Sequence, residues 1–341
     1  ARATGRGPGV DAGVMASLQS SYAALTAEAE GLVAEETGLR PAGRARARVT
    51  DRSGWIGANV RSFERLLQPL TDKFAEREPS RLQPLVGKAG GAQLGLLLGW
   101  MSGRVLGQYD LLLIEDADDV ADQDVVYYVG PNLLGMERRY AFPPEQFRLW
   151  VALHECTHRA QFMGVPWLRP YFVERVHELL GTVEPDGSQV LETVRRAVAD
   201  ARAGRRPLDR GGLAALFATP QQLEVLDRLG GLMSLLEGHG EVVMNRAAGR
   251  LVPTAWRFER VLKARRETAG GLSRFLNRLL SFEAKLAQYA EGERFITAVE
   301  RHGGRALFDT VWEGPDRLPT LAEIRRPQLW IDRVTGAVPA I

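Results

Sequence analysis

The feature that most constrains the fold is a pair of histidines, His154 and His158, four positions apart in an uninterrupted helical pattern over residues 145–162. Two prolines directly before this pattern suit the first turn of a helix. Side chains four residues apart lie on one face of a helix, so both imidazoles can converge on one metal ion. We therefore predict a helix here whose two histidines point into a covered cleft and bind Zn²⁺.

The residue that follows the first histidine, Glu155, completes the pattern. It lies about 100° around the helix from His154, which places its carboxylate beside the metal and not on it. There it can take a proton from a zinc-bound water, whose pKa the metal lowers to roughly 7. Apolar residues flank the motif on both sides, which argues against a chance match on a surface helix. We predict that Glu155 is the catalytic base, whereas Cys156, turned away from both histidines, packs in the interior.

A catalytic zinc site needs a third protein ligand and keeps its fourth position for water. One class of zinc enzymes takes that ligand from a histidine six residues after the second one, but Gly164 stands there, and Gln161 replaces the expected glycine at three residues. We predict Glu237 instead, because it lies on an apolar helical face where an unpaired carboxylate would be costly. Gly238 and Gly240 beside it leave room for another helix.

Other residues near these positions have alternative interpretations. Glu241, one turn after Glu237, is predicted to accept a hydrogen bond from the non-ligating nitrogen of a zinc histidine. His239 could replace Glu237 as ligand. Otherwise it is either a neutral catalytic group that forms a hydrogen bond near the substrate or an interior histidine whose hydrogen bonds are satisfied, and the sequence favours neither of these two. Glu174 and Glu178 repeat the spacing of Glu237 and Glu241, but their charged segment indicates a solvated face.

Periodicity along the chain predicts a mainly α (α+β) fold. Apolar spacing predicts helices over residues 14–36, 60–76, 85–106, 145–162, 173–180, 188–203 and 220–248, and further helical segments from 256 to 299. Residues 109–114 and 125–129 are predicted as a small antiparallel hairpin beside the helix that carries the two histidines. We expect the basic stretch 40–52 to be a solvated linker and the tail from Pro315 to be extended. Glycines at every fourth residue from 91 to 107 predict a smooth face for close helix packing.

Composition excludes several classes of protein. The chain has 44 Lys and Arg residues against 42 Asp and Glu residues, so its charge of +2 gives no case for nucleic acid or membrane partners. The most apolar stretch, 89–103, falls short of the roughly 18 residues that suggest a membrane span. A single cysteine cannot form an internal disulfide, and no export signal is evident. We therefore expect a cytoplasmic protein.

The chain resembles a zincin-like metallopeptidase family that is often labelled as associated with biosynthesis of the deazaflavin redox coenzyme. The similarity spans roughly residues 49–334 and is carried by 51–59, 129–132, 154–162, 166–168, 236–239, 243–244, 285–289 with Gly292, and 318–320 with Glu323. The resemblance implies a mainly helical zincin fold with a downstream Glu-Gly-His helix, but supplies no substrate. This sequence departs from the family pattern at Asn245, a position that is often acidic in the family. We predict an N-terminal helical segment and linker over 1–48 and a metallopeptidase domain over 49–341.

The function favoured by these residues is that of a zinc-dependent metallohydrolase, a peptidase or amidase, in which Glu155 activates water. The alternative is a catalytically silent zinc-binding scaffold or regulatory protein. The presence of Glu155 favours the enzyme, because a structural zinc site needs no base and normally fills all four positions with protein groups.

Overall fold

The computed structural model describes residues 11–75, 83–111, 124–181, 220–249, 251–267 and 282–336. The chain forms two compact units. Unit 1 comprises Ala1–Arg169 and Val243–Arg260, and unit 2 comprises Pro170–Val242 and Val261–Ile341. Three helices have residues in both units, namely α6 (Leu168–Gly181), α9 (Pro220–Ala248) and α10 (Ala255–Glu267).

Unit 1 contains a three-stranded mixed sheet in the order β1-β3-β2. The strands are β1 (Arg46–Thr50), β2 (Gly107–Tyr109) and β3 (Val125–Val129). The central strand β3 consists of valines and tyrosines and is buried at every position, as expected of a strand covered on both faces. It pairs in parallel with β1 and antiparallel with β2. β2 is therefore an edge of the sheet within the described part of unit 1.

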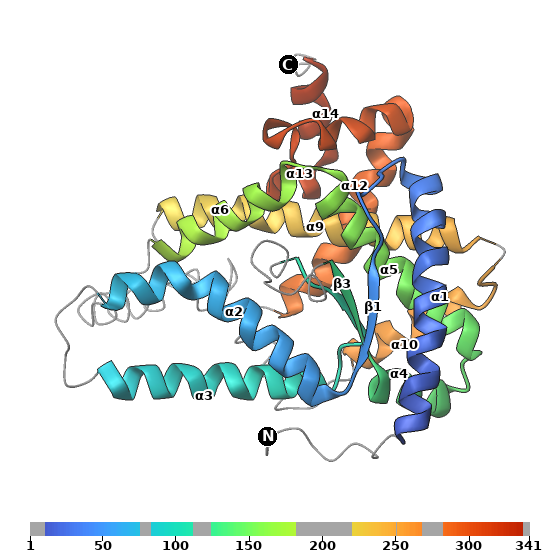
Figure 1. The fold of residues 1–341 in the computed structure, drawn as a ribbon. Helices are drawn as coiled ribbons and strands as arrows, with labels where there is room; N and C mark the ends of the chain where they lie inside the picture. The colour runs from blue at the N-terminus through green and yellow to red at the C-terminus, as the bar shows by residue number, and fades with distance from the viewer. Residues whose placement is uncertain are drawn as a thin grey trace. The chain divides into compact units, whose positions relative to one another are not determined.

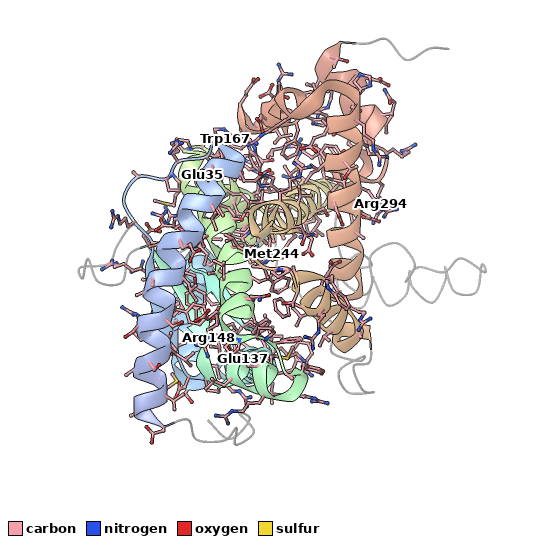
Figure 2. The ribbon with its side chains drawn as sticks, turned by 90° about the vertical axis from the view of Figure 1, so that its right-hand side faces the viewer. Glu35, Glu137, Arg148, Trp167, Met244 and Arg294 are labelled. Atoms are coloured by element: carbon pink, nitrogen blue, oxygen red, sulfur yellow. The ribbon has the colours of Figure 1, made fainter. Side chains whose placement is uncertain are left out.

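Helices surround this sheet (Figure 1). They are α1 (Ala12–Thr37), α2 (Arg52–Ala75), α3 (Gln83–Ser102), α4 (Gly130–Tyr140) and α5 (Pro144–Gly164). α1 packs against both α5 and β1, and α5 also contacts β2. Between α1 and the sheet, Tyr22 stacks on Tyr128 at 3.8 Å between ring centroids. Figure 2 shows Arg148 of α5 beside Glu137 of α4, where a bidentate ion pair with distances of 2.7 and 2.9 Å joins the two helices.

Unit 2 is helical in its described residues. Besides its parts of the shared helices it contains α12 (Phe282–Asp309), the 3-10 turns η3 (Thr310–Trp312) and η4 (Pro315–Arg317), α13 (Leu321–Arg325) and α14 (Pro327–Thr335). α12 contacts both α13 and α14. The indole of Trp330 is buried against Phe295 and donates a hydrogen bond to the Arg317 carbonyl at 2.7 Å. This indole fixes the C-terminal helices on α12.

The predicted class, mainly α with a small sheet, is confirmed, and the predicted antiparallel strand pair is present as β2 and β3. Three details of the predicted sheet are wrong. The sheet is mixed, because β1 adds a parallel strand, and β1 lies inside the stretch 40–52 that we expected to be a solvated linker. β2 also runs over Gly107–Tyr109, so it shares only Tyr109 with the predicted strand 109–114. Pairing with the buried β3 overrides the basic, polar character of Arg46–Thr50, which sequence alone cannot anticipate.

Helix predictions succeed where periodicity is long and fail near prolines. α9 has the predicted bounds, and α1 and α5 agree within two residues. α4 was not predicted, and the tail from Pro315 is helical and not extended, since Pro327 occupies the first turn of α14.

At Gly91 and Gly95 an added Cβ would meet open space, so these glycines do not mediate the expected close packing. The predicted helix 188–203 falls outside the described residues, and the boundary at residue 48 stays a prediction.

No helix in the described ranges combines the length and the apolar character needed to cross a membrane.

Candidate metal centre

The two histidines of α5 face each other. The Nε2 atoms of His154 and His158 are 3.1 Å apart, with ring planes at 85°. Two nitrogens that are each about 2.0–2.1 Å from one tetrahedral zinc lie roughly 3.3 Å apart. The spacing observed in unit 1 therefore fits a pair of zinc ligands on adjacent helical turns.

Gln161 fixes the orientation of the second histidine. Its Oε1 lies 3.0 Å from His158 Nδ1, and its side chain is fully buried. A neutral imidazole that donates from Nδ1 keeps the lone pair on Nε2, the form that binds a metal. In the sequence, Gln161 excludes one class of zinc enzyme, and no contact with His158 was predicted for it. Its spacing of three residues from His158 was the signal for this contact, because such residues are neighbours on a helix.

The carboxylate of Glu155 is held by the edge strand. Its Oε2 accepts a hydrogen bond from the Tyr109 backbone N–H at 3.1 Å, and the side chain is 7% exposed. A Cβ added at Gly107 would lie 2.7 Å from Glu155 Cγ and 2.8 Å from Oε1, closer than real Cβ contacts allow. Gly107, counted in the sequence as part of a helix-packing stripe, instead makes room on β2 for the predicted catalytic side chain.

A buried ion network anchors α5 to its surroundings. Arg159 is 2% exposed and donates to Glu30 of α1 at 2.6 Å, to Asp124 before β3 at 2.8 Å, and to the Ala42 carbonyl at 3.2 Å. Buried charges are tolerated when they are paired in this way. The sequence pattern did not predict this role of Arg159. Cys156 is buried as predicted, and desolvation raises the pKa of its thiol well above the usual value.

In unit 2, glycines determine where α9 lies. A Cβ added at Gly238 would overlap the backbone at Gly292 of α12, and one at Gly231 would overlap the backbone from Pro319 to Leu321. The prediction that Gly238 leaves room for another helix is therefore confirmed. Glu237, beside this close contact, is 7% exposed.

His239 is 5% exposed and lies against two aromatic rings of unit 2. Its ring centroid is 5.5 Å from that of Phe308 and 5.2 Å from that of Trp312. These contacts suit either interpretation of His239, a satisfied interior histidine or a group near the substrate. The catalytic role of His239 stays a prediction. Glu241 is partly buried, and its predicted hydrogen bond to a zinc histidine also stays a prediction.

The competing acidic pair on α6 has a different environment. Arg175 forms ion pairs with Glu174 at 2.7 Å and with Glu178 at 2.6 Å, and the Glu174 side chain is 68% exposed. This arrangement agrees with the predicted charged face and offers no buried carboxylate for a metal.

Among the described residues, the histidine, cysteine and carboxylate side chains that could together hold a metal ion are His154, His158 and Glu237. They are the three residues that the sequence predicted as zinc ligands.

Comparisons with known proteins agree with this chemistry. A crystal structure from Chloroflexus aurantiacus, described as "a putative hydrolase with a novel fold", matches with a TM-score of 0.71 and 32% sequence identity, over 99% of this chain and 96% of that one. The search of curated proteins gives no match. The model of the zincin-like metallopeptidase family matches residues 1–331. On the strength of this match, the chain belongs to the zincin-like metallopeptidase family.

Proposed function

We propose that this protein is a zinc-dependent hydrolase that cleaves peptide or amide bonds. The observation that carries the proposal is local to unit 1. The Nε2 atoms of His154 and His158 lie 3.1 Å apart, and Glu155, which follows His154, is a buried carboxylate held by the edge strand β2. Family membership supports hydrolysis as the class of reaction.

The zinc ligands in this proposal are His154, His158 and Glu237. The chemistry of the donor set fits zinc, since two imidazoles and one carboxylate leave a fourth position open. When bound there, zinc would polarise the substrate carbonyl and lower the pKa of water. Gln161 contributes by accepting a hydrogen bond from His158 Nδ1, which leaves the lone pair of the imidazole on Nε2, the atom that would bind zinc.

Glu155 is the proposed general base. The Tyr109 N–H donates to Oε2, which fixes the orientation of the carboxylate against β2. Such positioning allows it to accept a proton from water and return it to the leaving amine. In the same proposal, His239 is a neutral group that donates a hydrogen bond to the substrate, and Glu241 supports a zinc histidine.

The proposed setting is a reducing compartment, with peptides or amides and not nucleic acids or membranes as partners. The near balance of acidic and basic residues and the single buried cysteine favour this choice.

The test combines metal analysis with a peptide-library hydrolysis profile. We expect about one zinc per chain in the purified protein and cleavage that a chelator abolishes and zinc restores. His154→Ala and His158→Ala should lose the zinc. If both variants keep a full complement of metal, the ligand assignment is wrong. If the wild type binds zinc but cleaves nothing in a broad library, the silent scaffold becomes the better proposal.

A further inference from the structure

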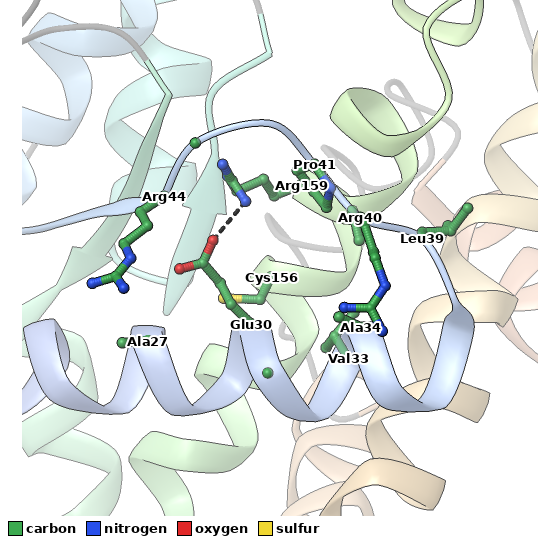
Figure 3. Close-up of a pocket in the computed structure, with 13 residues that line it drawn as sticks. Ala27, Glu30, Val33, Ala34, Leu39, Arg40, Pro41, Arg44, Cys156 and Arg159 are labelled. Carbon is green, nitrogen blue, oxygen red and sulfur yellow. Dashed lines mark hydrogen bonds and ion pairs between the residues drawn. The ribbon is translucent and has the colours of Figure 1, made fainter.

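A pocket lies in unit 1 on the side of α5 that carries Cys156 and Arg159 (Figure 3). It has a volume of about 330 Å³ and is bounded by α1, by α5 and by residues 39–44, which connect α1 to β1. This volume is within the range of roughly 300–1,000 Å³ found for small-molecule sites. None of the residues proposed for zinc binding or catalysis lines it.

Small side chains keep the pocket open. Ala27, Gly31 and Ala34 follow one another along a single face of α1, and Ala160 of α5 also lines the pocket. A Cβ added at Gly31 would meet nothing within 4 Å. The apolar side chains of Val33 and other lining residues complete a surface suited to a short hydrocarbon group.

The pocket also carries positive charge that is not neutralised locally. Arg40 and Arg44 line it and are exposed, and within the described part of the chain neither forms an ion pair or a hydrogen bond. Figure 3 shows their side chains on either side of Glu30. The Glu30 carboxylate is already engaged, since its Oε1 accepts from Arg159 at 2.6 Å and from the Ala45 N–H at 3.0 Å.

The buried ion network of Arg159, Glu30 and Asp124 leaves the net charge at the pocket positive. Arg159 is shared between Glu30 and Asp124, which leaves the network one negative charge in excess, and the two outer arginines outweigh that excess. Guanidinium groups present planar, paired donors that match the oxygens of carboxylates and phosphates. Arg40 and Arg44 form the rim of the pocket, and its interior is apolar. This combination favours a ligand with one anionic group and one apolar group.

We propose that this pocket binds a small organic anion, with its carboxylate or phosphate group at the rim formed by Arg40 and Arg44 and its apolar part against Gly31 and Ala160. The ligand would contact the same helix that carries the proposed zinc histidines, but it would bind independently of the hydrolytic function. The two possible head groups share one chemistry, so the experiment must distinguish them.

Isothermal titration calorimetry at constant ionic strength provides the test. The purified protein is titrated with hexanoate, butyl phosphate, inorganic phosphate and hexanol. We expect hexanoate or butyl phosphate to bind at least about tenfold more tightly than both inorganic phosphate and hexanol, and the tighter of the two identifies the head group. No measurable binding of either amphiphilic anion, or equal binding of inorganic phosphate, would overturn the proposal.

Two variants locate the site, each by a different mechanism. Gly31→Leu should fill the pocket without removing a charge, and it suits a helix better than glycine does, so it should fold. The double change Arg40→Gln with Arg44→Gln should remove the cationic rim. We expect each to weaken binding at least about tenfold. Arg301→Gln, an equal loss of charge at an exposed site on α12, should leave binding unchanged. Unchanged affinity in Gly31→Leu would refute the location, whatever the arginine variant does.

Discussion

The two helices that carry the predicted zinc ligands are positioned by different physical means. On α5, in unit 1, individual side chains are oriented by polar contacts: Gln161 on His158 and the β2 backbone on Glu155. In the part of α9 that belongs to unit 2, the helix backbone is placed by glycines that admit a neighbouring backbone at Gly231 and Gly238. Conservative changes on α5 should therefore alter the chemistry with little loss of stability, whereas changes beside Glu237 should act through packing.

The largest expected effect is on the unit 1 side. Glu155→Gln removes the base but keeps the shape of the side chain, so catalysis should fall by about 10²–10⁴-fold, the usual contribution of general acid–base catalysis. Zinc content should be unchanged, because the ligands remain. Both quantities are measured on the same preparation, by initial rates and by elemental analysis. An active Glu155→Gln protein would contradict the mechanism.

The next effect concerns the contribution of α9 to the metal. Glu237→Ala should reduce zinc affinity by more than the factor of about 10–100 typical of residues outside the coordination sphere. A zinc competition titration measures it. Glu178→Ala is the matched control, because this glutamate has the same spacing but pairs with Arg175 on a charged face. Near-native affinity in Glu237→Ala together with a collapse in His239→Ala would transfer the ligand role to His239.

Replacing one glycine in each unit tests the comparison directly. Gly107→Ala should displace the Glu155 carboxylate and lower the rate by about 10²-fold, since a misplacement of this size is costly, while the melting temperature changes little. Gly238→Ala should instead lower stability by about 1–3 kcal/mol, because the contact with Gly292 is between backbones that cannot yield.

Rates and thermal unfolding are measured for both glycine variants, with Gly91→Ala as the control in open space. If Gly107→Ala lost stability and kept its rate, the distinction between the two helices would fail.

The smallest effects are expected from residues that support the ligands. Gln161→Ala should weaken zinc binding by about 10–100-fold, because His158 loses the partner that sets its tautomer. Glu241→Ala should act within the same range if this residue supports a zinc histidine as predicted. Competition titration measures the zinc affinity of both variants. If only Gln161→Ala weakens binding, the residues that orient the zinc ligands lie on α5 and not on α9.

The sequence predicted the two histidines and Glu155 because their relationship depends only on helical spacing, which is local. It predicted Glu237 from an apolar helical face, and the bounds of α9 are those predicted. The long helices α1 and α5 were accessible for the same reason, since a period of 3.6 residues can be read without knowledge of any neighbour.

Tertiary structure decided what depends on partners distant in sequence. β1 forms from a basic segment because the buried strand β3 offers a ladder of hydrogen-bonding groups, and Arg159 can be buried only because Glu30 and Asp124 meet it. Gly107 is needed because Glu155, 48 residues later in the chain, occupies the space of its missing side chain. Local pattern thus determined which residues could do the chemistry, whereas packing and charge compensation across the fold decided which residues hold them in place.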